Sequence, residues 1–156
     1  MTANVADNEM CVVRRVVHVP PAAVYRVWTE PRFARQWSWG RQHDTISVEI
    51  DCRVGGMWRQ TIRNRELDEV WTFDGEFREV VPARRLIHTF HWRSDKGVDH
   101  GTSLVAIDFL AHAEGTEVVI THTQLRDVEV RDGTERGWEQ VLADVAEVAE
   151  GADTSG

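Results

Sequence analysis

The sequence predicts a single α+β domain in which an antiparallel sheet of about seven strands curls around one long C-terminal helix. The chain has 156 residues, the length of one ordinary domain, and 42% of them are hydrophobic. Short segments of alternating apolar and polar residues fill its middle, and an apolar stripe with helical spacing comes last. We expect the domain at residues 11–150, between polar tails at residues 1–10 and 151–156.

The beginning of the domain predicts one strand and then two short helices. Cys11 to Val19 is rich in β-branched residues and stops at Pro20-Pro21. Proline suits the first helical position, which needs no amide hydrogen, so Ala22 to Glu30 is expected to form the first short helix. Pro31 opens the second helix in the same way, and that helix is expected to end near Trp39-Gly40.

The middle of the chain predicts a meander of strands joined by short turns. The expected turns contain Gly55-Gly56, Pro82-Ala83-Arg84 and Glu114-Gly115. Connections this short favour antiparallel pairing over parallel βαβ units. The predicted strands span Thr45 to Cys52, Met57 to Arg63, Glu69 to Phe77, Arg85 to Arg93, Thr102 to Ala113 and a last strand through Val118, Ile120 and His122.

The end of the domain predicts one long amphipathic helix. Asp132, with Glu135 three residues later, predicts a capped start, and Gly151 predicts the stop. The apolar face of the sheet is the only large partner for the helix, so the two are expected to pack together. The apolar stripe, with spacings of three and four, consists of Trp138, Val141, Leu142, Val145 and Val148.

The seven tryptophans of the chain predict the walls of a cavity between sheet and helix. A curled sheet leaves a space that one helix does not fill, and an aromatic hollow is typical of a small-molecule site. Trp37 and Trp39 are expected at its mouth, as a lid over a ligand or as a plug. Gly75 is expected to leave room for a ring, the helix or a ligand. The expected walls are Trp58, Trp71, Phe73, Phe90, Trp92, Val105, Ile107, Phe109 and Trp138.

Three polar residues, Gln60, His88 and His122, are expected to face the same space. Each imidazole could orient a ligand or act as a general acid or base, or it could be a core histidine held by a backbone carbonyl or by Gln60. His91 lies three residues from His88 and therefore on the opposite face, so we expect no metal site and no cofactor. Asp74 is expected on the solvated outer face, and no serine lies in a nucleophile motif.

The charge balance argues against two classes of partner. The formal net charge of −8 at pH 7 disfavours nucleic acid and an anionic membrane surface. The chain shows no secretion signal, no membrane-spanning segment and no C-x-x-C motif. We therefore expect a cytoplasmic protein whose partner is a small hydrophobic molecule, and we leave a homodimer open.

Several motifs follow one another along the chain: Pro21-Ala22-Ala23-Val24-Tyr25, Trp37-Ser38-Trp39-Gly40, Asp51 to Arg59, Val81-Pro82 with Leu86, Gly115-Thr116 and Gly137-Trp138. In this order and spacing the chain resembles the SRPBCC superfamily of START-like, helix-grip proteins over about residues 11–150. Within it, the chain is most similar to the subfamily of homologues of the activator of a heat-shock chaperone ATPase. It departs from the family pattern in two places, where a Trp-Trp-Gly-Pro stretch is loosened to Trp37-Ser38-Trp39-Gly40-Arg41 and where Thr134 replaces a frequent histidine.

The resemblance implies a helix-grip fold with an internal cavity. We consider three functions for such a domain. The leading hypothesis is the binding of a small hydrophobic or aromatic ligand without covalent catalysis. The second is an aromatase/cyclase-type enzyme, a cyclase or dehydratase acting on a polyketide-like substrate by acid/base catalysis. The third is a co-chaperone-type protein-interaction domain that works through its outer surface. Because one fold carries several functions, the site must decide between them.

Overall fold

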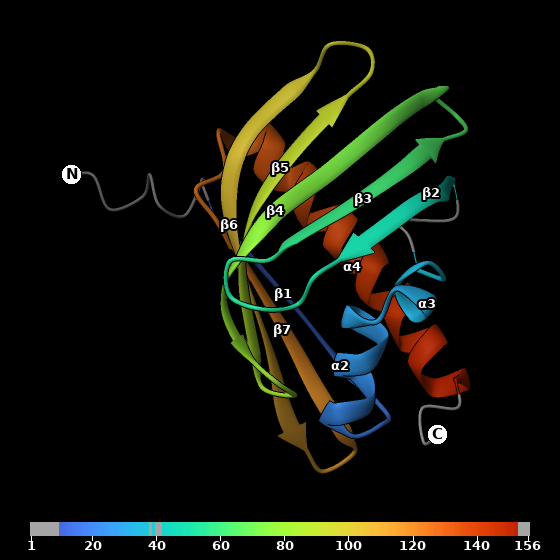
Figure 1. Ribbon diagram of the computed structural model, residues 1–156, viewed down its shortest axis with the longest axis vertical. Helices are drawn as coiled ribbons and strands as arrows, with labels where there is room; N and C mark the ends of the chain where they lie inside the picture. Colours follow the sequence, from blue (N-terminus) through green and yellow to red (C-terminus); the bar gives the residue numbers. More distant parts are fainter. Residues whose placement is uncertain (1–9, 38, 40–41, 153–156) are drawn as a thin grey trace, which may run out of the picture.

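The computed structural model describes residues 10–37, 39 and 42–152 and confirms the predicted helix-grip architecture. A seven-stranded antiparallel sheet in the order β1-β7-β6-β5-β4-β3-β2 curls around the long C-terminal helix α4 (Figure 1). The elements are β1 (Cys11–Val17), α2 (Pro21–Thr29), α3 (Pro31–Ala34), β2 (His43–Ile50), β3 (Met57–Asn64), β4 (Glu69–Val81), β5 (Arg85–Ser94), β6 (Asp99–His112), β7 (Gly115–Thr123) and α4 (Val128–Gly151).

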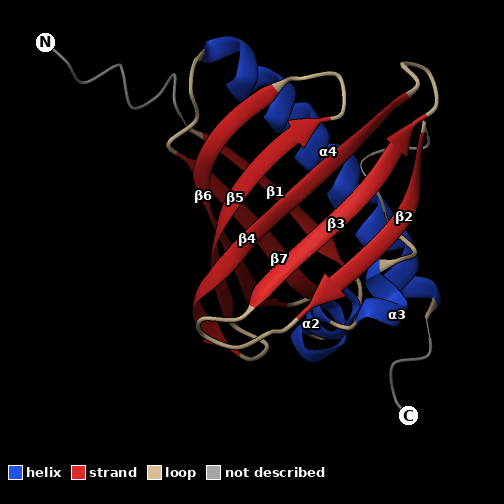
Figure 2. Ribbon diagram, turned by 45° about the horizontal axis from the view of Figure 1, so that its top comes forward, coloured by secondary structure: helices blue, strands red, loops and turns tan. Residues whose placement is uncertain are grey.

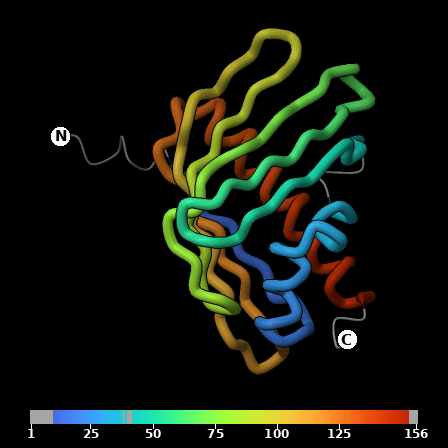
Figure 3. Tube along the Cα trace, viewed as in Figure 1, coloured from blue at the N-terminus to red at the C-terminus, as the bar shows by residue number. Residues whose placement is uncertain are grey.

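Helix α4 crosses the concave face of the sheet, and the two short helices lie near its C-terminal end (Figure 2). In the chain trace, the turns of the β3–β4 and β5–β6 hairpins lie at the other end, with the first turns of α4 (Figure 3). The two ends of the space between sheet and helix are therefore built from different segments.

The start of α4 corrects the sequence prediction. The helix begins four residues before Asp132, because the side chain of Asp127 accepts a hydrogen bond from the Val130 amide at 3.0 Å and caps it. Asp132 lies inside the helix and accepts a hydrogen bond from Arg131 instead. The first turn contains two β-branched residues, Val128 and Val130, which have a low helix propensity. The sequence therefore does not predict a helix at this turn. Gly151 ends the helix as expected.

The second short helix is also shorter than predicted, because it ends at Ala34. Gly40, the expected end, lies outside the described residues. Trp37 and Trp39 therefore stand on the segment after the helix, between α3 and β2.

Gly75 permits a close approach between β4 and β5. A Cβ atom at this position would lie 1.8 Å from the Thr89 carbonyl oxygen and 2.9 Å from Nε1 of Trp58. The first clash is with backbone, which cannot move aside without separating the strands. Of the expected neighbours, Gly75 thus makes room for a ring, that of Trp58, and it also makes room for the backbone of the neighbouring strand.

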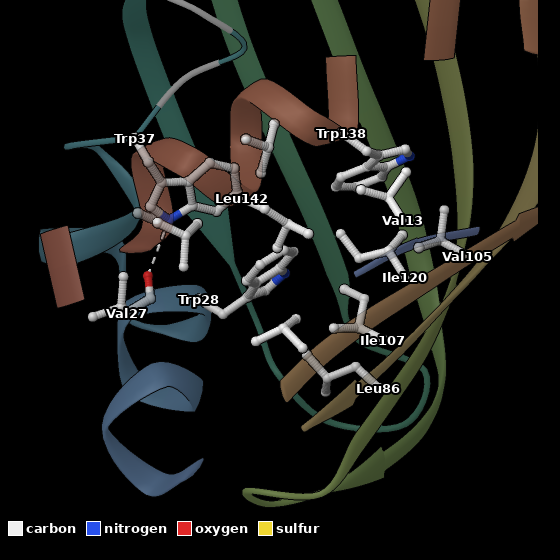
Figure 4. Close-up of a cluster of buried hydrophobic side chains, with 14 of the residues drawn as sticks. Val13, Val27, Trp28, Trp37, Leu86, Val105, Ile107, Ile120, Trp138 and Leu142 are labelled. Carbon is white, nitrogen blue, oxygen red and sulfur yellow. Dashed lines mark hydrogen bonds between the residues drawn. The ribbon is translucent and has the colours of Figure 1, made fainter. Parts of the chain in front are cut away.

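The part of the concave face beside α2 is a packed apolar core, part of which is drawn in Figure 4. Val105 and Ile107 of β6 are fully buried there, in the same cluster as Trp28 of α2 and Leu142 of α4 (Figure 4). The predicted wall residues Val105, Ile107 and Phe109 thus pack against other side chains at this end. The remaining space lies towards the first half of α4.

Candidate functional site

Trp39 divides the remaining space between sheet and helix into two parts. The inner part is a small cavity of about 30 Å³, and the outer part is a larger and somewhat more open pocket of about 280 Å³. The inner cavity has room for a water molecule or two but not for an organic ligand. Its lining consists of Trp28, Thr29, Ala34, Trp37, Trp39, Val48, Ile50, Trp58, Gln60, Phe77, His88 and Trp138.

The outer pocket lies between the hairpin ends of the sheet and the first turns of α4. Its aromatic walls are four of the predicted residues, together with the ring of Trp39 at its inner end. Its lining consists of Trp39, Gln42, His43, Trp71, Phe73, Phe90, Trp92, Gly133, Thr134, Arg136, Gly137 and Gln140.

Trp39 is held firmly as the partition. Its ring stacks on Phe73 with centroids 4.7 Å apart and lies against Trp138 at 4.6 Å. Its Nε1–H donates to Oε1 of Gln60 at 3.1 Å. A Cβ atom at Gly137 would lie 2.9 Å from the indole, so the glycine lets α4 approach the ring. Gln60, predicted as a ligand contact, therefore positions the partition.

Trp37 is a plug at the inner end and not a lid over the outer pocket. Its Nε1–H donates to the carbonyl oxygen of Val27 at 3.1 Å (Figure 4). Its ring packs against Trp28 with centroids 5.3 Å apart and is only 6% exposed. This arrangement ties the segment after α3 to α2, so of the two predicted roles the plug describes this structure.

His122 is a fully bonded core histidine. Nε1–H of Trp138 donates to its Nδ1 at 2.9 Å, and its Nε2 lies 2.6 Å from Oγ of Ser103. Because the indole can only donate, Nδ1 holds the lone pair and Nε2–H donates to Ser103, whose hydroxyl donates to the Phe90 carbonyl at 3.3 Å. Burial, and secondly the nearby His88, lower the pKa of His122 to about 3. The ring is therefore neutral and fixed in one tautomer.

His88 lies beside the inner cavity. Its Nδ1 is 2.8 Å from the Thr89 carbonyl oxygen and 2.9 Å from Nε1 of Trp58, and one nitrogen cannot donate to the first while it accepts from the second. In both tautomers Nε2 has no hydrogen-bond partner among the described residues, and the cavity lies next to the ring. Burial lowers the pKa of His88 to about 4, against a smaller opposing effect of the bond to Thr89.

The outer face of the sheet carries charged side chains that pair with one another. His91 lies opposite to His88, with its Nε2 2.8 Å from the Asp99 carboxylate. Asp74 accepts from Arg93 at 3.0 Å and lies 3.7 Å from Arg59. In the described part of the chain, no three His, Cys, Asp or Glu side chains gather as a metal site would require.

Nor does any helix in that part have the length and hydrophobicity to cross a membrane.

The sequence prediction missed the polar rim of the outer pocket. Gln42 and His43 precede the predicted start of β2. Thr134, Arg136 and Gln140 lie in α4, for which the sequence prediction considered only the residues of the apolar stripe. One available signal was the glycine pair at positions 133 and 137. Two glycines four residues apart on a helix lie on the same face and leave a hollow there.

A curled antiparallel sheet that grips a C-terminal helix and keeps an aromatic pocket between them defines the class of helix-grip domains. The sequence pattern of the family described as Activator of Hsp90 ATPase homolog 1-like protein matches residues 18–150. The chain therefore belongs to this family, which confirms the resemblance to the SRPBCC superfamily.

Solved structures support the same fold. A protein from Chromobacterium violaceum is 25% identical, with a TM-score of 0.79 over 92% of this chain and 99% of that one. An uncharacterised protein from Rhizobium leguminosarum is 24% identical, with a TM-score of 0.80 over 93% of this chain and 96% of that one. The AHSA1-like protein from Aeromonas hydrophila is 20% identical, with a TM-score of 0.71 over 90% and 92%. Among curated proteins, the comparison finds no match.

Proposed function

We propose that the domain binds a small hydrophobic or aromatic molecule in the outer pocket, without covalent catalysis. The observation that carries the proposal is a pocket of about 280 Å³ walled by the rings of Trp39, Trp71, Phe73, Phe90 and Trp92. This volume lies near the lower end of the range of about 300–1,000 Å³ for small-molecule sites. A compact molecule of up to three aromatic rings therefore fits the pocket better than a long polyketide chain.

The positions of the two histidines support binding over acid/base catalysis. A general acid or base must reach the reacting group of its substrate. Both ring nitrogens of His122 are hydrogen-bonded, one to Trp138 and the other to Ser103. His88 lines the inner cavity, which Trp39 separates from the outer pocket. The cyclase hypothesis gains no support from this arrangement, and the protein-interaction hypothesis stays a prediction.

The test uses the neutral fluorescent dye N-phenyl-1-naphthylamine and a pair of variants at one position. A Cβ atom at Gly133 would meet only Nη2 of Arg136, at 4.0 Å, so Gly133→Ala leaves the pocket open and Gly133→Leu fills it. We expect the wild type and Gly133→Ala to bind the dye with equal affinity and Gly133→Leu to bind it at least about tenfold more weakly. Losing the apolar burial of even one ring edge amounts to more than about 1.4 kcal/mol.

Circular dichroism and urea unfolding provide the control, since all three proteins should be folded to the same extent. The proposal fails if the wild type takes up no dye, or if a folded Gly133→Leu variant binds it as tightly as the wild type does.

A further inference from the structure

We propose that the molecule bound in the outer pocket carries a carboxylate, which Arg136 and Thr134 hold at the mouth of the pocket. This inference rests on the proposed function and adds the chemical class of the ligand: an aromatic or hydrophobic body with one anionic group. Three observations on the first turns of α4 carry it.

The first observation is the position of the guanidinium group of Arg136. Arg136 lines the outer pocket, and its Nη2 lies 4.0 Å from the Cβ position of Gly133, one turn earlier in α4. The side chain therefore lies back along the helix across a residue that has no side chain of its own. This places its N–H donors beside the aromatic walls.

The second observation is that Arg136 has no carboxylate partner. Its neighbour Arg131 pairs with two acidic side chains of this segment, Asp132 at 2.7 Å and Glu135 at 3.1 Å. Arg136 forms no hydrogen bond or ion pair with any residue that the structure describes, whereas most of the other described arginines pair with a carboxylate. A guanidinium group binds a carboxylate through two parallel N–H donors, so Arg136 keeps this capacity for a ligand.

The third observation concerns the polar groups around it. Thr134 lines the same pocket, and its hydroxyl has no hydrogen-bond partner among the described residues. The hydroxyl is therefore available to donate a hydrogen bond to a ligand oxygen. No described residue that lines the pocket is acidic, although the chain as a whole has a net charge of −8.

The overall negative charge does not oppose this site strongly. Charges farther away than about 8–10 Å are largely screened at physiological ionic strength, so the local guanidinium group decides the sign that a ligand meets. The polar rim thus favours an anion, and the aromatic interior favours an apolar body.

The test compares two ligands that differ only in charge: 2-naphthoate and its neutral analogue 2-naphthamide. Each is titrated against bound N-phenyl-1-naphthylamine in the wild type, in Arg136→Gln and in Arg15→Gln, which removes an exposed arginine of β1 outside the outer pocket. We expect the wild type and Arg15→Gln to bind naphthoate about fivefold more tightly than naphthamide, as fits a solvent-accessible ion pair. In Arg136→Gln the two should bind equally.

Thr134→Val should weaken naphthoate binding about threefold with no change for the dye, because one hydrogen bond to the charged oxygen is lost. The inference fails if the dye binds normally but naphthoate and naphthamide displace it equally from the wild type, or if Arg136→Gln keeps the preference. If the dye itself does not bind, the proposed function fails and this inference fails with it.

Discussion

Acidification is expected to destabilise the fold because two histidines are buried as neutral rings. Burial lowers the pKa of His88 to about 4 and that of His122 to about 3, against about 6.5 in the unfolded chain. At a pH between the native pKa values and about 6.5, both histidines are protonated in the unfolded state but not in the native state. The free energy of unfolding therefore falls as the pH drops below about 6.5. The loss levels off once the pH passes the two native pKa values.

The magnitude follows from the size of this window. Each pH unit below 6.5 costs about 1.4 kcal/mol for each histidine, so lowering the pH from 7.5 to 5.0 costs about 2 kcal/mol per ring and about 4 kcal/mol in total. That is a large part of the stability of an ordinary domain. The carboxyl groups with lowered pKa values, such as Asp99 and Asp127, act mainly below pH 5 and leave this window to the histidines.

The assay is urea unfolding followed by circular dichroism at several pH values between 7.5 and 5.0. Replacing His122 by Gln should reduce the pH dependence by about half, because one of the two buried rings is gone. A free energy of unfolding that stays constant between pH 7 and pH 5.5, or a His122→Gln variant with the wild-type slope, would refute the reasoning.

Three further predictions concern packing and capping, and urea unfolding measures all of them. Gly137→Ala should destabilise the protein by about 1–3 kcal/mol, because its Cβ would lie 2.9 Å from Trp39, whereas Gly133→Ala should stabilise it by up to about 1 kcal/mol; equal effects would contradict the close approach at Trp39. Asp127→Ala should cost about 1 kcal/mol through the lost helix cap and Asp132→Ala clearly less, and the reverse order would restore the start predicted from the sequence. Trp39→Ala should cost about 3–5 kcal/mol and should join the two cavities, so that larger naphthalene derivatives bind; a loss below 1 kcal/mol would mean that Trp39 is not a packed partition.

The sequence was sufficient for the strands because their inward faces repeat every second residue. Trp71, Phe73, Phe90 and Trp92 were placed on the concave face by this alternation alone, and all four line the outer pocket. Alternation predicts on which side of the sheet a side chain lies. It does not predict whether that side chain lines a pocket or lies in the packed core. Alternation therefore predicts Val105 as a cavity wall, although it lies in the packed core.

The division of the space by Trp39 could not be predicted from periodicity. It depends on a segment without regular structure, on the amide of Gln60 and on the missing side chain of Gly137, which come together only in the folded chain. The role of His122 was open for the same reason. Its partners Ser103 and Trp138 come from β6 and α4, and only their positions show that both ring nitrogens are used.

A crystal structure of the protein with bound N-phenyl-1-naphthylamine tests the central claim most directly. The naphthyl rings are expected in the outer pocket, between Trp71 and Trp92 on one side and Gly133 on the other, with Trp39 as the inner boundary. A dye molecule bound elsewhere on the protein, with the outer pocket free of it, would contradict the claim that this pocket is the binding site.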